Sequence, residues 1–217
     1  MFADRAHAGR MLAAELLPRQ WPKPVVLALP RGGVPVAVEV ALALDAPLDL
    51  VIVRRIGAQA SPELAVAAVA EGGGEPVLDA EAMEASGTYR AHVEVRARAE
   101  RAEALRRRAL YAGKSPPMDL RGRTAIVVDD GVATGTSARA ALKAVRARGP
   151  ERLILAVPVA SRQGASAVMA EADGFVCLEQ PAFLRAVGVH YADFHPLSDE
   201  QVLAALARVR DRRRSAR

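Results

Sequence analysis

The chain has 217 residues, 51% of them hydrophobic and 25% charged, which is the composition of a globular protein long enough for one α/β domain. No apolar run approaches the roughly 20 residues of a membrane span, and residues 1–10 lack the apolar core of a secretory signal. We therefore expect a cytoplasmic protein without a membrane partner, and the single cysteine, Cys177, fits a reducing compartment. The net charge of +5 suits either nucleic acid or an anionic small substrate, but the 4% aromatic content gives no ladder of basic and stacking side chains.

Helix-like and strand-like segments alternate along the chain. Asp4 is a suitable N-cap for a first helix, and Pro35 falls in the first turn of a second helix, where proline is tolerated. Ser198 and Gln201 have the spacing of a capping box at the start of the last helix. In chain order we expect a helix at 3–17, a strand at 24–30, a helix at 34–44, strands at 48–56 and 64–70, a helix at 86–110, a strand at 124–128, a helix at 136–148, a strand at 152–160, a helix at 161–171, a strand at 174–180 and a helix from 198.

This alternation predicts an α/β fold with a mainly parallel sheet covered by helices on both faces. No internal repeat and no long low-complexity linker divides the sequence, so we expect residues 1–217 to form a single domain. Ligands of such sheets bind beyond the carboxyl ends of the strands. The Gly-rich turns that follow the strands at 24–30 and 124–128 are therefore where we expect a ligand to bind.

One of these turns carries acids, glycines and hydroxyls together, in the sequence IVVDDGVATGTSARAAL from Ile126 to Leu142. It is neither a Walker A loop, which needs G-x-x-x-x-G-K-[ST], nor a G-x-G-x-x-G dinucleotide fingerprint. The backbone N–H groups and hydroxyls of residues 134–137, with a helix N-terminus behind them, can bind one phosphate. Asp129 and Asp130 would repel that phosphate and instead suit a neighbouring diol, a Mg²⁺ ion or developing positive charge. The segment therefore predicts a ligand with a phosphate, a ribose and a metal-bound anion.

The run VVDDGVATGTS resembles the ribose-phosphate loop of type I phosphoribosyltransferases, which use phosphoribosyl pyrophosphate (PRPP). The resemblance implies that Asp129 and Asp130 are catalytic residues that hold the ribose 2′- and 3′-hydroxyls and a Mg²⁺ ion. It further implies a small hood, formed by the C-terminal segment with or without the N-terminal one. The 5′-phosphate would lie against the residues that follow the acids, namely Ala133, Thr134, Gly135, Thr136 and Ser137.

A second turn, LPRGGVPVA at residues 29–37, resembles the pyrophosphate loop of the same family. By this resemblance, Gly32 and Gly33 would present N–H groups to pyrophosphate oxygens, and Arg31 would add positive charge as a third catalytic residue. The family often has a cis peptide bond in this loop that does not precede proline. In this chain it would be Pro30–Arg31 or the next bond.

Two arginines, Arg54 and Arg55, end the predicted strand at 48–56, at the same edge of the sheet. The family commonly has a basic residue here that contacts pyrophosphate, followed by a flexible loop that closes over the reactants and excludes water. That loop would include residues 57–63 or the glycines at 72–74. An inserted helical segment at about 81–113, which contains the long predicted helix, is not part of the minimal family core. It either covers the site or contacts another subunit.

The resemblance implies that a nitrogen nucleophile displaces pyrophosphate from ribose C1 through an oxocarbenium-like state. Members of the family that act on 6-oxopurines carry a carboxylate at the position of Ala133, so hypoxanthine and guanine are disfavoured here. Acceptors such as orotate and adenine stay open, and Asp193 or Glu63 could take over the missing acid–base role.

The C-terminal segment FLRAVGVHYADFHPL lies in a candidate hood at about 180–197 and loosely resembles the part of the family that recognises the base. Val187 and Tyr191 could pack against a ring, and Asp193 could accept its hydrogen bonds. Ordinary core and loop packing is the alternative for all three. Both histidines of this segment lack neighbours at metal-ligand spacing, and we expect them to pack or to face solvent.

Three classes of function fit these patterns. The first is a phosphoribosyltransferase that uses PRPP, Mg²⁺ and a nitrogenous base, in a homo-oligomer of which a dimer is the simplest form. The second is a PRPP-sensing regulator that kept the fold and binds nucleic acid. It is disfavoured because basic residues concentrate only in the tail at 208–217 and in one helix that also carries acids. The third is a domain that works beside, or fused to, another enzyme.

Overall fold

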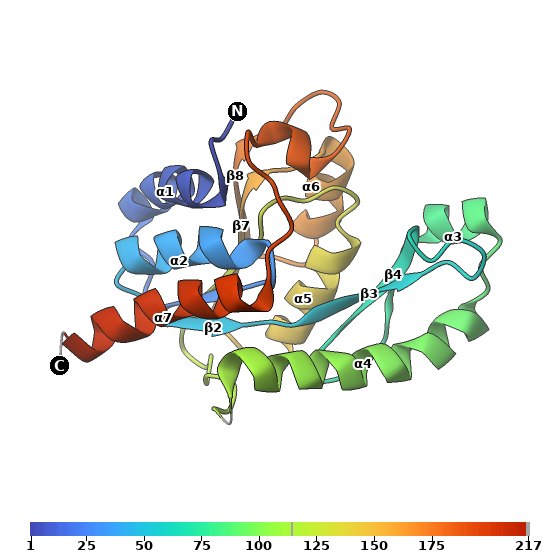
Figure 1. Cartoon of the computed structure of the whole chain (residues 1–217), viewed down its shortest axis with the longest axis horizontal. Helices are drawn as coiled ribbons and strands as arrows, with labels where there is room; N and C mark the ends of the chain where they lie inside the picture. Colours follow the sequence, from blue (N-terminus) through green and yellow to red (C-terminus); the bar gives the residue numbers. More distant parts are fainter. Residues whose placement is uncertain (114, 216–217) are drawn as a thin grey trace.

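Five strands form one parallel sheet at the centre of the molecule (Figure 1). The structure, a computed structural model, describes residues 1–113 and 115–215, so Lys114 and the last two residues of the basic tail lie outside it, as do the side chains of 213–215. The strand order across the sheet is β2 (Leu48–Leu50), β1 (Pro24–Ala28), β6 (Thr124–Val128), β7 (Arg152–Val159) and β8 (Gly174–Glu179). Every neighbouring pair in this sheet is parallel, so the predicted fold class is confirmed.

Helices cover both faces of the sheet, because successive residues of a buried strand point to opposite sides. Ile126 and Val128 pack with the helices of one face, and Ala125 and Val127 pack with those of the other. The helices of the first face are α1 (Arg5–Leu16), α2 (Gly33–Ala43) and α7 (Asp199–Ser215). Those of the second face are α5 (Thr136–Arg146) and α6 (Arg162–Met169).

The predicted starts of the first and last helices are confirmed by their caps. Asp4 Oδ1 accepts a hydrogen bond from the backbone N–H of His7 at 2.6 Å, which satisfies one of the free amides of the first turn. Ser198 and Gln201 exchange the two hydrogen bonds of a capping box, at 2.9 and 3.3 Å. Local sequence signals are therefore sufficient to predict where α1 and α7 begin.

The segment predicted as one strand at 48–56 is in fact two strands that belong to different sheets. The pairing of β2 with β1 ends at Leu50. The amide of Val51 still donates to the end of β1 at 3.0 Å, but the amide of Ile52 donates to the side chain of Glu71 at 3.2 Å. The chain then enters an antiparallel sheet of β3 (Val53–Gly57), β4 (Ala65–Ala70) and β5 (Val77–Leu78). The prediction was wrong because an apolar run indicates burial and does not identify the partner strand.

The inserted segment contains two helices, α3 (Ala80–Ser86) and α4 (Arg90–Ala112), where one helix at 86–110 was predicted. Gly87 ends α3 with a φ of 62°, a left-handed conformation that glycine adopts without steric cost. The predicted helix began at Ser86, so α3 was not predicted as a helix of its own.

Helix α4 lies along the antiparallel sheet (Figure 1), where Val93 and Ala97 are buried against it. At its other end a buried ion cluster fixes α4 to the parallel sheet. Arg108 is 7% exposed and donates to Asp49 at 2.8 Å and to Glu71 at 2.9 Å. No helix in the described ranges is long and apolar enough to cross a bilayer.

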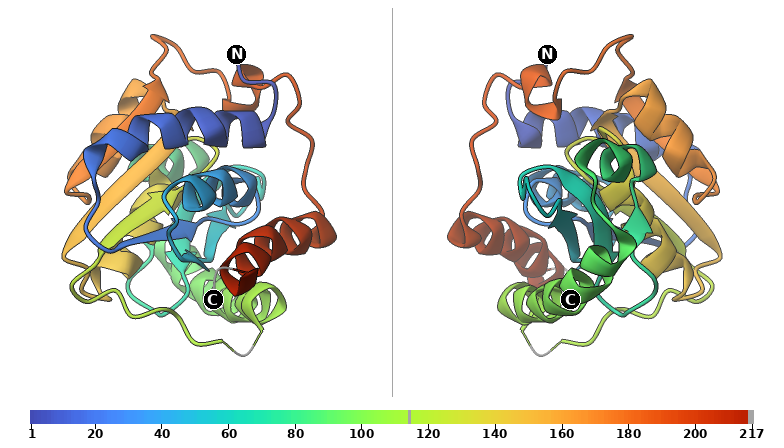
Figure 2. Two further views of the ribbon diagram at one scale, coloured as in Figure 1. Left: turned by 90° about the vertical axis from the view of Figure 1, so that its left-hand side faces the viewer. Right: turned by 90° about the vertical axis from the view of Figure 1, so that its right-hand side faces the viewer.

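The N-terminal residues pair with the segment that precedes α7, which includes the short 3₁₀ helix η2 (Val187–His190). The backbone N–H of Phe2 donates to the carbonyl oxygen of His190 at 2.8 Å, and that of Ala192 donates to Phe2 at 2.8 Å. The rings of Phe2 and Tyr191 are buried, with their centroids 5.3 Å apart. Figure 2 shows the N-terminus beside this segment, so the N-terminal residues and the segment before α7 lie side by side.

Candidate functional site

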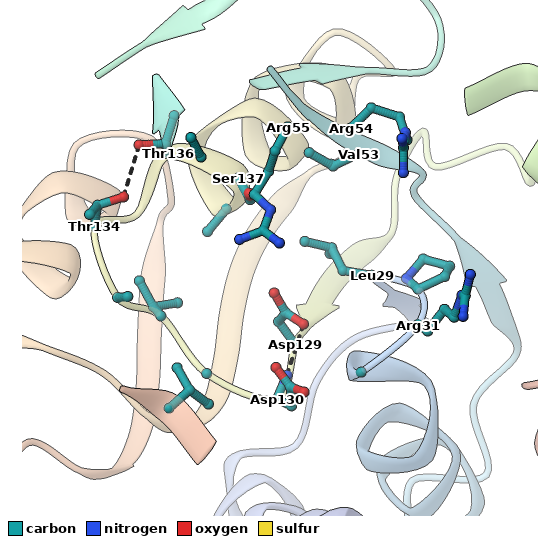
Figure 3. A pocket seen from close by; sticks show the side chains of 18 of the residues that line it. Leu29, Arg31, Val53, Arg54, Arg55, Asp129, Asp130, Thr134, Thr136 and Ser137 are labelled. Atoms are coloured by element: carbon teal, nitrogen blue, oxygen red, sulfur yellow. Dashed lines mark hydrogen bonds between the residues drawn. The ribbon is translucent and has the colours of Figure 1, made fainter. Parts of the chain in front are cut away.

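Two strand-to-helix turns meet at the carboxyl end of the sheet because the strands before them are neighbours. β1 and β6 pair in register, and their last paired residues are Ala28 and Val128. Residues 29–32 of the first turn and 129–135 of the second line one cavity of about 820 Å³ (Figure 3). Gly33 does not line it, and its N–H, predicted to face pyrophosphate, donates to the carbonyl oxygen of Leu29 at 3.0 Å. This volume is within the range of about 300–1,000 Å³ that is usual for small-molecule sites. Residues of the β3–β4 hairpin, of α4 and of the segment before α7 complete the walls.

Glycine is required in the first turn because the two turns are in close contact. A Cβ atom on Gly32 would lie 2.0 Å from Asp130 Oδ2, and one on Gly33 would lie 2.7 Å from the carbonyl oxygen of Val128. The peptide bond Pro30–Arg31 is cis, as the resemblance predicts. The bare backbone of this turn therefore lies directly against the acids of the second turn.

Asp129 and Asp130 form a pair of adjacent carboxylates in the cavity wall. The backbone N–H of Asp130 donates to Asp129 Oδ1 at 2.9 Å. Burial raises the pKa of the Asp129 carboxyl well above its usual range, and the charge of Asp130 raises it further, against the opposing charges of Arg5 and Arg55. Burial also raises the pKa of Asp130, against its hydrogen bond with Arg5. A cation or a set of hydroxyl donors placed beside this pair would be stabilised.

The turn after the acid pair runs along the cavity wall into the N-terminus of α5. Gly135 has a φ of 86° and immediately precedes α5, and no side chain of the described residues caps the first turn of that helix. The hydroxyls of Thr134 and Thr136 are 3.0 Å apart, and that of Thr136 donates to Asp79 Oδ2 at 3.0 Å. Residues 133–137 all line the cavity. Together with the positive end of α5, they form a site suited to an anion such as phosphate.

Arg54 and Arg55 have different surroundings although they are adjacent in β3. Arg55 points toward Asp129, whereas Arg54 points away from it (Figure 3). Arg54 donates to Glu100 of α4 at 3.0 Å. Neighbouring residues of a strand face opposite sides, which explains the difference. Of these two arginines, Arg55 is therefore the one directed at the acid pair.

Arg31 points away from the acid pair (Figure 3), toward the start of α7. Its Nη1 donates to the carbonyl oxygen of Leu197 at 2.7 Å, and its Nε lies 3.3 Å from a carboxylate oxygen of Asp199. The hydroxyl of Tyr111 donates to that same carboxylate. Arg31 thus lines the cavity with its charge already partnered by the segment around α7.

Of the three hood residues named as candidates for contact with a base, only Val187 is among the described residues that line the cavity. Tyr191 is buried, and its hydroxyl donates to the backbone carbonyl of Asp130 at 2.6 Å, so it supports the turn that carries the acids. Asp193 is exposed and bonded to a neighbouring histidine. Glu63, at the tip of the β3–β4 hairpin, does line the cavity.

Arg5 and Phe194 also line the cavity, and no sequence motif singles them out. Arg5 Nε donates to Asp130 Oδ2 at 2.8 Å, and its Nη1 donates to the carbonyl oxygen of His195 at 3.0 Å. The Arg5 guanidinium lies 3.8 Å from the centroid of the Phe194 ring. Arg5 and Asp130 are 125 positions apart, so no local pattern could have revealed the contact. Asp79, which accepts a hydrogen bond from the hydroxyl of Thr136, was missed for the same reason.

The acid pair could hold Mg²⁺ only together with ligands supplied by a substrate and by water. Among the residues that the structure describes, no group of three or more His, Cys, Asp or Glu side chains is placed to hold a metal ion. Mg²⁺ commonly binds through one or two carboxylates and takes its other ligands from substrate phosphates and water. Asp129 and Asp130 are a donor set of this kind, and the burial that raises their pKa values favours a cation beside them.

Fold and site together define an α/β protein in which two anion-suited turns and an acid pair face one cavity. The chain belongs to the phosphoribosyl transferase domain family, whose model matches residues 4–193. It is 44% identical to TT1426 from Thermus thermophilus, a solved structure with a TM-score of 0.77, over 95% of this chain and 98% of that one. It is 41% identical over 208 residues to Rv0571c of Mycobacterium tuberculosis strain H37Rv, provisionally named a phosphoribosyl transferase. That match covers 96% of this chain and 47% of the other, so the chain spans about half the length of the curated relatives it matches.

Proposed function

We propose that this protein transfers the 5-phosphoribosyl group of PRPP to a nitrogenous acceptor, in the first instance a nucleobase, and releases pyrophosphate. The observation that supports this most strongly is that residues 29–32 and 129–135, in the turns after two adjacent strands, line one cavity. The first turn suits a pyrophosphate, the second suits a phosphate, and the acid pair suits the ribose that joins them. PRPP carries these three groups on one molecule.

Each part of PRPP has its own partners in this proposal. The 5′-phosphate lies against residues 133–137 at the N-terminus of α5. Asp129 and Asp130 accept hydrogen bonds from the ribose hydroxyls, hold Mg²⁺, and favour the positive charge that develops on the ribose. The pyrophosphate lies along the backbone of Gly32, because the N–H of Gly33 already donates to the carbonyl oxygen of Leu29. Arg55, which faces the cavity, takes the charge-supplying role first predicted for Arg31, whose side chain is partnered elsewhere.

The acceptor nitrogen forms a bond to ribose C1 while the bond from C1 to the pyrophosphate oxygen breaks, and pyrophosphate leaves with the electron pair. Mg²⁺, when bound, supplies positive charge that offsets the charge of the pyrophosphate. The acceptor must also lose its proton, and Ala133 cannot take it. We assign this role to Glu63, the one other carboxylate, besides the acid pair, among the described residues that line the cavity.

The acceptor binds beside Val187 and Phe194 in this proposal, under a hood made of residues 180–197 and the N-terminal residues that pair with them. The absence of a carboxylate at Ala133 disfavours 6-oxopurines as acceptors. We also propose that the protein works as a homodimer and without nucleic acid, and that residues 1–217 act as one domain.

A panel of purine and pyrimidine bases, incubated with labelled PRPP and Mg²⁺, tests the proposal through nucleotide formation. We expect turnover with at least one base in the wild type, and none when Asp129→Asn and Asp130→Asn are combined in a folded variant. Retained turnover in that variant would show that the acids are misassigned. PRPP binding without turnover on any base would instead favour the PRPP-sensing regulator, and a salt-dependent shift in a nucleic-acid binding assay would support it.

A further inference from the structure

Arg5, the first residue of α1, joins three parts of the site that the two motifs do not connect. It donates to Asp130 Oδ2 at 2.8 Å and to the carbonyl oxygen of His195 at 3.0 Å. Its guanidinium also lies 3.8 Å from the centroid of the Phe194 ring, which is a cation–π contact. The side chains of Arg5 and Asp130 are only 11% and 16% exposed, so solvent and salt screen this ion pair weakly.

Each carboxylate of the acid pair has one oxygen that accepts a hydrogen bond within the protein and one that accepts none from the described residues. Asp129 Oδ1 accepts from the backbone N–H of Asp130, and Asp130 Oδ2 accepts from Arg5. Asp130 Oδ2 is also packed on Gly32, where a Cβ would come within 2.0 Å. Among the described residues, no other residue donates a hydrogen bond to Asp129 Oδ2 or to Asp130 Oδ1. Each carboxylate is therefore fixed through one oxygen and keeps the other for a ligand.

The other contacts of Arg5 reach the segment that we place on the acceptor side of the cavity. Phe194 lines the cavity, and the contact to His195 uses its backbone carbonyl and so does not depend on its side chain. The same segment is held by backbone hydrogen bonds to Phe2, three residues before Arg5. A planar guanidinium can donate to two acceptors and stack on a ring at once, which a lysine ammonium cannot do.

We infer that Arg5 is a positioning residue for the ribose: it orients Asp130 toward the ribose hydroxyls and joins that orientation to the acceptor-side segment at residues 194–195. The inference rests on the proposed function, because it assigns the ribose to the acid pair. Arg5 acts through Asp130, and the open oxygen of Asp130 is the one that binds the ligand. Arg5 therefore supports ribose binding and does not compete with it.

Calorimetric titrations with PRPP and ribose 5-phosphate in the presence of Mg²⁺, and with inorganic pyrophosphate in its absence, test this inference. The variants are Arg5→Gln and Arg5→Lys, with Arg10→Gln as a matched control at an exposed position of the same helix. We expect Arg5→Gln to weaken PRPP and ribose 5-phosphate binding by about 10- to 100-fold, the usual effect of losing a hydrogen bond to a charged group. Pyrophosphate affinity should stay unchanged, because without Mg²⁺ that ligand does not use Asp130. Arg5→Lys should give an intermediate loss, and Arg10→Gln should match the wild type.

Several results would overturn the inference. Equal losses for all three ligands in Arg5→Gln would indicate general damage to the site, and unchanged affinities would show that Arg5 has no role in binding. Tighter ribose 5-phosphate binding in Arg5→Gln would show that Arg5 competes with the ribose for Asp130. Failure of the wild type to bind PRPP would be a distinct result, because it would contradict the proposed function and, with it, this inference.

Discussion

Thr136 donates its hydroxyl to Asp79 Oδ2 at 3.0 Å, so the start of α5 is hydrogen-bonded to the residue that begins the inserted helical segment. The other oxygen of Asp79 accepts from the backbone N–H of Ala82 at 3.1 Å and caps α3. Thr136 is 7% exposed, which shields this hydrogen bond from water. The inserted segment therefore reaches the turn that we assign to the 5′-phosphate, through one carboxylate that holds the starts of two helices.

Replacement of Asp79 should separate its geometric role from its charge. Asp79→Ala loses both the cap and the acceptor for Thr136, and we expect the free energy of unfolding to fall by about 1–2 kcal/mol. Asp79→Asn keeps an N-cap of equal quality and an acceptor oxygen, so its stability should match that of the wild type. Urea denaturation measures both. A stability of Asp79→Ala equal to that of the wild type would show that the contact contributes nothing.

Arg54 and Arg55 should have separable effects, because they face opposite sides of β3. Arg55→Ala removes an exposed charge directed at the cavity, so we expect weaker pyrophosphate binding and an unchanged free energy of unfolding. Arg54→Ala removes one of the two arginines bonded to Glu100, which is 9% exposed and keeps Arg96, so it should lower the free energy of unfolding by about 0.5–1.5 kcal/mol with little effect on binding. Calorimetry and urea denaturation on the two variants check this. Loss of pyrophosphate binding in Arg54→Ala alone would reverse the assignment.

Asp129 should destabilise the free protein at neutral pH. Its pKa in the folded chain is raised well above 3.8 by burial and by Asp130, so the folded state binds its proton more tightly than the unfolded state does. The resulting loss of folding stability is absent at pH values below the pKa of Asp129 in the unfolded chain. It grows as the pH rises toward the pKa in the folded chain, and it is complete above that pKa. We therefore expect Asp129→Asn to be more stable than the wild type at pH 7, with a difference that shrinks as pH falls toward 4. Denaturation curves across that range test this, and a wild type that is the more stable at pH 7 would contradict it.

Both turns of the site could be predicted from the sequence because each is a continuous motif between a strand and a helix. The spacing of Asp129, Gly135 and Thr136 within one short run is a local property, and so are the adjacent glycines after β1. Arg5 was not predictable, because it meets Asp130 only after the N-terminal helix has packed across the sheet. The same holds for Asp79, which approaches Thr136 only once the antiparallel sheet has formed.

The fold also had parts that could be predicted from the sequence and parts that could not. Alternating strands and helices were sufficient to predict the parallel sheet and its two layers of helices. The change of sheet after Leu50 was not predicted, because residues on both sides of that point are apolar and equally suited to strands. It has a direct consequence for the site, since the change brings Arg55 and Glu63 over the carboxyl end of the parallel sheet, where they line the cavity.

Calorimetric titration of PRPP into the protein with Mg²⁺ tests whether one ligand occupies both turns at once. We expect one PRPP per chain, bound more tightly than either ribose 5-phosphate or pyrophosphate alone, because PRPP joins the two binding groups in a single molecule. The variant with Asn at both Asp129 and Asp130 should lose this gain. No binding at millimolar PRPP, or PRPP binding no tighter than that of pyrophosphate, would contradict the claim.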